Sequence, residues 1–193
     1  MACVIVLGCY RSGTSAVAGV LHHLGVMMGK EFDPPAHTNP TGFFEDLDFK
    51  RICDKLMLGK EVEGQLAVVV KLREAEYPLW GVKDPQLCLL LPKLVPLLKD
   101  HRIISTLRPK EDICKSLSEA GIFAQPPERF EPLVDYYLQR KADNLAVYSG
   151  PVLEVDFETL KTDRVAEVER IANFVNLPVK QEAIDFISAG GMT

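Results

Sequence analysis

The chain has 193 residues, of which 47% are hydrophobic and 25% charged, and these ordinary globular values exclude the disordered, collagen-like and coiled-coil classes. This length is sufficient for one well-buried domain, and we expect a single domain over residues 1–193. The formal net charge of −5 argues against a general nucleic-acid binder, so a polyanionic ligand would need a local basic pocket.

The first predicted elements are a strand, a glycine-bounded turn and a helix. Four apolar residues at 4–7 predict a buried strand, and residues 14–24 form a helix-compatible run. Between them, Gly8 and Gly13 bound a turn whose backbone N–H groups, with those of the helix start, can point into one concavity and bind an anion. The sequence therefore predicts a phosphate-binding loop.

The residues of this loop differ from those of the ATP-type pattern G-x-x-x-x-G-K-[ST]. Thr14 replaces the lysine, Ser15 is kept, and the cation stands inside the loop at Arg11. The run Arg11, Ser12, Gly13, Thr14, Ser15 matches [KR]-S-G-T-[ST] at every position, and here the chain resembles the sulfotransferases that use 3′-phosphoadenosine 5′-phosphosulfate (PAPS). The resemblance implies that Arg11 and the N–H groups of residues 12–15 hold the 5′-phosphosulfate. The alternative is an ordinary turn with an exposed arginine.

The helix at 14–24 has an apolar stripe at positions 17, 20, 21 and 24, and Gly25 is its expected end. His22 and His23 lie off this stripe. Because adjacent helical side chains point about 100° apart, we expect two surface histidines that form no joint site.

A proline-rich loop at 30–42 leads into a second predicted helix, which Gly59 ends. A loop of this length in a compact domain is often functional. Residues 39–46, Asn-Pro-Thr-Gly-Phe-Phe-Glu-Asp, look like the N-P-x-G-[FY]-[FW]-E-[DN] block of many bacterial-type sulfotransferases, which implies that Glu45 is the catalytic base. The alternative is that Glu45 and Asp46 only favour the positive helix N-terminus, a role that we assign first to Asp46.

Residues 61–76 are compatible with a helix, although the three valines at 68–70 also suit a strand. Residues 79–85 predict a short buried strand and a polar turn, with Pro85 opening the next helix. The G-x-K-D-P block is also recurrent in the family. Lys83 would lie in the crevice at the carboxyl end of the sheet, where parallel sheets bind ligands, unless it is a turn lysine paired with Asp84. Two prolines in the Leu-rich stretch 86–99 predict a broken helix.

The next predicted strand covers residues 102–107, and Pro109 marks the start of a helix after it. The family binds the 3′-phosphate with an arginine after a strand and a serine eight positions later, and Arg108 and Ser116 have this spacing. Ser116 would lie roughly 10 Å along the helix, so both side chains can address one phosphate. A core arginine and a helix-face serine are the alternative.

The remaining pattern predicts a helix at 132–148, a strand at 152–155 and two C-terminal helices at 165–175 and 179–187. A strand followed by [YF]-E-[DT]-L also occurs in the family at the position of residues 157–160. The alternation of apolar strands and helices predicts an α/β fold with three layers, α/β/α, and a mainly parallel sheet, like that of P-loop nucleotide kinases.

The cysteines and the chain start indicate a compartment. Five cysteines without C-x-x-C spacing favour neither a complete disulfide framework nor a zinc site. The apolar start lacks the pattern of a signal peptide, and no run approaches the roughly 18 apolar residues of a spanning helix. We expect a cytoplasmic protein that binds neither membrane nor nucleic acid.

The resemblance implies a sulfotransferase that moves a sulfuryl group from PAPS to an acceptor hydroxyl or amine and releases adenosine 3′,5′-bisphosphate (PAP). In this reading Arg11 binds the phosphosulfate, Lys83 neutralises the charge on the leaving phosphate, and Glu45 takes the acceptor proton. No metal is expected, because these cations and the helix N–H groups supply the neutralisation. A P-loop nucleotide kinase-like phosphotransferase and a noncatalytic nucleotide-binding module remain alternatives.

The chain also departs from the family. The histidine block of the members that act on small phenols and steroids is missing, so neither His37 nor His101 is assigned a role. Their C-terminal R-K-G-x-x-G block is absent as well. The chain is short for the family, so we expect a small acceptor pocket or one completed by another subunit, as in a homo-oligomer. The acceptor class stays open.

Overall fold

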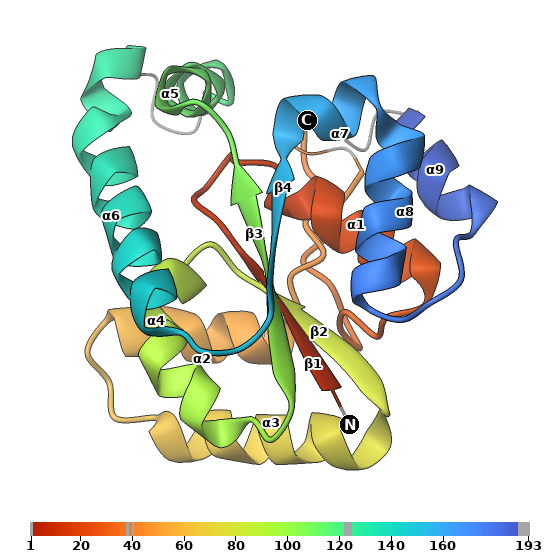
Figure 1. The fold of residues 1–193 in the computed structure, drawn as a ribbon. Coiled ribbons are helices and arrows are strands. Elements are labelled where there is room, and N and C mark those ends of the chain that lie inside the picture. The colour runs from red at the N-terminus through yellow and green to blue at the C-terminus, as the bar shows by residue number, and fades with distance from the viewer. Residues whose placement is uncertain (1, 38, 40, 122–124, 189–193) are drawn as a thin grey trace.

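The computed structural model describes residues 2–37, 39, 41–121 and 125–188. Its centre is a parallel sheet with the strand order β2-β1-β3-β4 (Figure 1). The strands are β1 (Ala2–Leu7), β2 (Leu79–Lys83), β3 (His101–Leu107) and β4 (Val152–Asp156). Because all four run in one direction, the loops that follow them meet at one edge of the sheet. The predicted parallel α/β fold is confirmed.

Helices cover both faces of the sheet (Figure 1). One face is covered by α2 (Leu47–Met57), α3 (Glu63–Glu76), α4 (Leu87–Leu94), α5 (Lys110–Glu119) and α6 (Glu131–Val147), and the other by α1 (Thr14–Leu24), α7 (Phe157–Thr162), α8 (Arg164–Phe174) and α9 (Gln181–Ser188). The prediction of three layers is therefore confirmed. Within the described ranges, no helix is both long and apolar enough to cross a bilayer.

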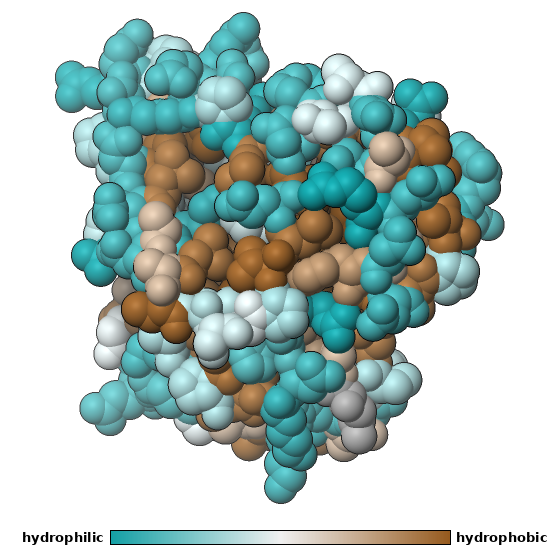
Figure 2. All heavy atoms as spheres, in the orientation of Figure 1, coloured by the Kyte–Doolittle hydropathy of each residue, from teal (hydrophilic) through white to brown (hydrophobic). Residues whose placement is uncertain are grey.

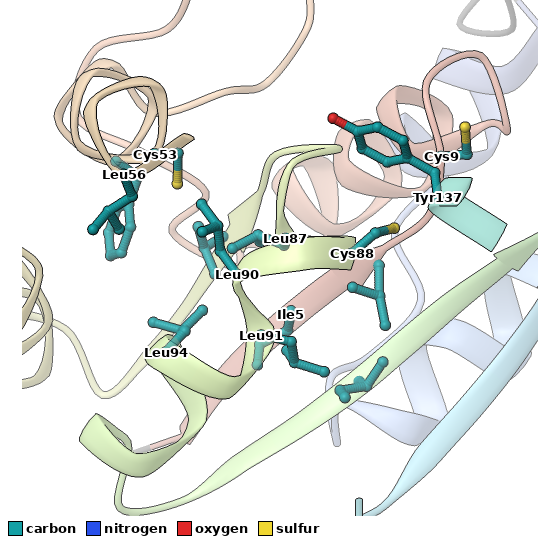
Figure 3. Packing of buried hydrophobic residues seen from close by; sticks show 14 of the residues in the cluster. Ile5, Cys9, Cys53, Leu56, Leu87, Cys88, Leu90, Leu91, Leu94 and Tyr137 are labelled. Atoms are coloured by element: carbon teal, nitrogen blue, oxygen red, sulfur yellow. The ribbon is translucent and has the colours of Figure 1, made fainter. Parts of the chain in front are cut away.

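The central strand β1 has side chains buried on both faces. Ile5 and Leu7 pack into the cluster beneath α2–α6, whereas Val4 and Val6 pack against α1, α8 and α9, and all four are fully buried. Figure 3 shows the labelled leucines of α4 in this cluster, with Leu91 next to Ile5. Burial on both faces explains why this strand reads as a continuous apolar run. Truncating Ile5 to alanine would cost about 2–5 kcal/mol.

The segment around α4 begins differently from the prediction. The helix starts at Leu87, and Pro85 lies in a turn in which Leu87 N donates to Asp84 O at 3.0 Å. The Asp84 carboxylate accepts the N–H of Gln86 at 2.8 Å and so stabilises this turn. The expected break is confirmed, because α4 ends at Leu94 and a 3-10 turn, Val95–Leu97, follows. Residues 63–76 are helical, which settles the open choice for the valines at 68–70.

An aromatic cluster joins α1, α9 and the loop before α2. His22 and His23 lie near the surface, as predicted, and their rings meet edge to face with centroids 5.5 Å apart. Their rings also contact phenylalanines from the other two segments. The cluster consists of His22, His23, Phe32, Phe44 and Phe186.

The strand β4 forms one edge of the sheet, and no further strand lies beside it in the described part of the chain. Val152 at its start has 39% of its surface exposed. Figure 2 shows hydrophobic side chains gathered across the middle of the molecular face that is turned to the viewer. In the same orientation, Figure 1 places β4 there, between α6 and α8.

Candidate active site

The loop between β1 and α1 is held to the end of β3 by a serine. Ser12 Oγ donates to Cys9 O at 2.6 Å and lies 2.8 Å from Thr106 Oγ1, while Ser12 N donates to Cys9 O at 3.2 Å. Arg11 has a positive φ of 62°, a conformation that L residues adopt rarely and usually where the surroundings enforce it. The loop is thus a fixed turn that directs the Arg11 side chain.

Both glycines of the loop are required by close approach. A Cβ atom on Gly8 would collide with Thr106 Oγ1, and one on Gly13 would collide with the ring of Phe157. Gly13 also has a positive φ of 94° and precedes α1 without a side-chain hydrogen bond from the described residues to the helix start. The N–H groups of the first turn of α1 can therefore donate to an anion.

Arg11, Arg108 and Ser116 come together in space. Arg11 Nε donates to Ser116 Oγ at 2.9 Å, and Arg108 Nη1 donates to Arg11 O at 2.7 Å. The Arg108 guanidinium also stacks over the Phe157 ring at 4.6 Å from its centroid. Burial, followed by the positive charge of Arg108, lowers the pKa of Arg11. Two guanidinium groups in this position favour a bound anion, which would relieve their repulsion.

Glu45 lies between two lysines. Lys83 Nζ is 2.6 Å from Glu45 Oε1 and 3.2 Å from Ser15 Oγ, so it spans the distance from the carboxylate to the start of α1. Lys50 Nζ is 3.3 Å from Glu45 Oε2 and 3.7 Å from the carboxylate of Asp33. Lys83 is therefore paired with Glu45, and the alternative of a solvated lysine paired with the neighbouring aspartate is wrong.

The pKa values of the two buried carboxyls near Lys83 are shifted in opposite directions. Burial alone would raise the pKa of Glu45, but the charges and hydrogen bonds of Lys83 and Lys50 outweigh it and lower this pKa. Burial and the charge of Glu45 raise the pKa of Asp84 to about 7, and Asp84 Oδ2 has no hydrogen-bond partner among the described residues. Glu45 is thus ionised at neutral pH and able to accept a proton.

Arg11, Glu45 and Lys83 line a cavity of about 260 Å³ at the carboxyl edge of the sheet, whereas Arg108 and Ser116 are not part of its lining. Its lining comes from the loop after β1, the start of α1, the loop before α2, α2 itself, the end of β2 with the turn after it, and α5: Tyr10, Arg11, Gly13, Thr14, Ser15, Asp33, Asn39, Phe43, Glu45, Lys50, Lys83, Pro85 and Leu117. A larger and more open hollow of about 560 Å³ lies between α2 and α3 but contains none of the predicted site residues. Of these two hollows, only the smaller one is lined by predicted site residues.

Several cavity residues were missed by the sequence reasoning. Lys50 has a weak signal, since it stands four residues after Asp46, the residue that precedes α2, and so faces back toward the loop. Asp33 and Asn39 sit in the proline-rich loop, where no periodicity indicates direction. Pro40 of the predicted N-P-x-G block lies outside the described residues.

The histidines and possible metal ligands lie elsewhere or are dispersed. His37 is exposed, and His101 begins β3 at the edge of the sheet opposite to the cavity. Over the described ranges, no group of three or more His, Cys, Asp and Glu residues is arranged to hold a metal ion.

Comparisons with known proteins identify the fold. No family model and no curated protein sequence matches the chain. The sulfotransferase domain of the Synechococcus PCC 7002 olefin synthase aligns with 100% of this chain and 79% of its own, at 18% identity and a TM-score of 0.61. The sulfotransferase STF1 of Mycobacterium tuberculosis aligns with 96% of this chain and 70% of its own, at 18% identity and a TM-score of 0.58. The chain therefore has the fold of bacterial sulfotransferase domains.

Proposed function

We propose that this chain is a PAPS-dependent sulfotransferase, which transfers a sulfuryl group to an acceptor hydroxyl or amine and releases PAP. The observation that carries the proposal is the contact between Arg11 in the first loop and Ser116 on α5, with Arg108 bonded to the same loop. These are the residues expected to bind the two ends of a 3′,5′-phosphorylated nucleotide. The fold shared with sulfotransferase domains supports the same reading.

Binding of the donor would use three kinds of group. The N–H groups of residues 12–15 and the Arg11 guanidinium would hold the 5′-phosphosulfate, and Arg108 with Ser116 would hold the 3′-phosphate. The adjacent arginines and the helix start, which no described side chain caps, fit a polyanion of this kind. The donor supplies an activated sulfuryl group, and the chain's residues orient it and the acceptor.

Glu45 would act as the base and Lys83 as the stabilising cation. The Glu45 carboxylate would take the proton from the acceptor as the new bond to sulfur forms and the bond from sulfur to the phosphate oxygen breaks. Lys83 reaches both Glu45 and Ser15, so its ammonium can stabilise charge that develops on the leaving phosphate. The PAP product leaves with the negative charge, and the proton returns from Glu45 to solvent.

A turnover assay tests this function and its two alternatives. The protein would be incubated with PAPS and a panel of sugars, phenols and amines in EDTA, and the formation of PAP measured. We expect acceptor-dependent PAP formation in EDTA, and loss of it in Glu45→Gln. Magnesium-dependent consumption of ATP would instead indicate a phosphotransferase. Thr14 argues against that function, because the ATP-type loop has a lysine at this position. Binding of PAP without turnover on any acceptor would indicate a noncatalytic module.

The setting of the protein is also part of the proposal. All five cysteines are buried and unbridged, as expected for a protein that keeps its thiols in a reducing cytoplasm. We propose a cytoplasmic enzyme without nucleic-acid or membrane partners. Its cavity of about 260 Å³ would accept a small acceptor or be completed by a second copy of the chain.

A further inference from the structure

An arginine outside the cavity is joined to the residue after Glu45. Arg73 on α3 is 3% exposed, and so is Asp46. Arg73 Nη2 lies 2.8 Å from Asp46 Oδ2 and Arg73 Nε 3.3 Å from the same oxygen. Arg73 does not line the cavity, and its contact with Asp46 links it to the residue next to Glu45.

Asp46 connects three segments of chain. Its Oδ1 accepts the N–H of Asp48 at 2.9 Å and caps α2, while its Oδ2 also accepts the N–H of Lys30 at 3.2 Å. Beside it, Asp33 N donates to Glu45 O at 3.1 Å. The Arg73–Asp46 pair thus fixes α3, the start of α2 and the loop at residue 30 to one another, and the backbone of Glu45 is part of this junction.

The backbone before Glu45 is strained. Phe44 has a positive φ of 55°, which L side chains rarely adopt and which the surroundings must therefore enforce. On one side, the Phe44 ring packs against His22, Phe32 and Phe186. On the other side, Asp46 is held by Arg73. Glu45 stands between these two anchors.

We propose that Arg73 is a positioning residue, which through Asp46 sets the place of the Glu45 carboxylate between Lys83 and Lys50. The description of Glu45 as a base rests on the proposed function, whereas the positioning itself can be measured without turnover. Loss of Arg73 would leave Asp46 buried without its cation, and the segment 44–46 would shift to bring that carboxylate to water. The Glu45 carboxylate would then leave Lys83.

Arg73→Met and Arg73→Lys separate positioning from folding. Methionine keeps the apolar volume and removes the charge. Lysine keeps the positive charge but lacks the two guanidinium nitrogens with which Arg73 contacts Asp46. It should therefore restore only part of the positioning of Glu45. Asp48→Ala is the matched control, because it removes only the half-exposed partner of the same arginine. Val168→Ala on α8 is the second control, which lowers stability in the core far from the pair.

The experiment is a titration of the Glu45 carboxyl by ¹³C NMR, assigned with Glu45→Gln. The charged groups that face Glu45 are Lys83, Lys50 and Asp84, with Asp33 beyond Lys50. We expect the midpoint for Glu45 to rise in Arg73→Met, to rise less in Arg73→Lys and to stay unchanged in both controls. PAP affinity should not change, because Arg11, Arg108 and Ser116 lie on other elements.

Activity gives the second readout. Turnover should fall by about 100-fold in Arg73→Met, with an unchanged KM for the donor, as expected for a displaced catalytic group. An unchanged Glu45 titration in folded Arg73→Met, or in Arg73→Lys if the first variant does not fold, would overturn the proposal. A native protein that turns over no acceptor would refute the sulfotransferase function instead, and the titration would still decide whether Arg73 positions Glu45.

Discussion

Arg11 Nε donates a hydrogen bond to Ser116 Oγ at 2.9 Å, although the two residues stand 105 positions apart in the sequence. This bond joins the loop after β1 to the helix after β3. The groups expected to bind the 5′ and 3′ ends of the donor are therefore already in contact in the free protein. A site arranged before binding loses less free energy to ordering when the ligand arrives.

The first prediction concerns Arg108 and Ser116. Arg108→Ala should reduce the preference for PAP over adenosine 5′-monophosphate by about 2–4 kcal/mol, because a charge-assisted contact to a dianion is lost. Ser116→Ala should weaken the binding of PAP by about 1 kcal/mol, because one hydrogen bond of the hydroxyl is lost. Since both side chains would contact one phosphate, the binding free energies lost in the two single variants should not add up to the loss in the double variant. Calorimetry on the two variants and their double variant checks this, and equal losses for both nucleotides would contradict it.

The second prediction is that Arg11→Ala weakens sulfuryl transfer by about 2–4 kcal/mol, the cost of removing one preorganised charge-stabilising donor. Initial rates at saturating acceptor, with EDTA present throughout, are the measurement. Arg51→Ala on α2 is a control that removes an exposed arginine outside this cavity. The assignment fails if the two variants lose activity equally.

The third prediction is that Glu45→Gln lowers turnover by roughly 10² to 10⁴ while PAP affinity changes little, because the base is removed and the shape is kept. Lys83 lowers the pKa of Glu45, so the native enzyme should remain active at pH values below the usual range of a glutamate. A rate against pH profile on both proteins is the test. Near-normal turnover in the variant would assign the base to another residue.

The fourth prediction uses the buried carboxyl of Asp84. Its folded-state pKa of about 7 lies above the unfolded value of about 3.9, so between these pH values only the folded state keeps the proton. The free energy of unfolding should therefore fall as pH rises through this window. Asp84→Asn keeps the acceptor for Gln86 N and should be more stable than the native protein at about pH 8. Denaturant unfolding of both proteins at about pH 5 and pH 8 measures their free energies of unfolding. If the difference between the two proteins is the same at both pH values, the prediction is contradicted.

Much of the fold could be predicted from local sequence. Short-range chemistry explains the apolar run of β1, the glycines that follow the ends of α1 and α2, and the break of the helix after Leu94. The start of α4 could not be located as well, because Gln86 N donates a hydrogen bond to the Asp84 carboxylate, and the resulting turn moves the start of the helix beyond Pro85.

Less of the candidate site than of the fold could be predicted from the sequence. The loop residues and Glu45 could be named from motifs, but the partner of Lys83 depends on how β2 and the start of α2 meet in space. The Arg73–Asp46 pair joins α3 to the residue before α2, 27 positions away in the sequence, and leaves no periodic signal. Long-range pairs of this kind are set by packing of whole elements, which local patterns do not encode.

The most direct test is a calorimetric titration of the unmodified protein with PAP and with adenosine 5′-monophosphate, both in EDTA. If Arg11, Arg108 and Ser116 form the donor site, PAP should bind about 30- to 1,000-fold more tightly, which corresponds to about 2–4 kcal/mol for the 3′-phosphate. Equal affinities for the two nucleotides would contradict both the donor and the site.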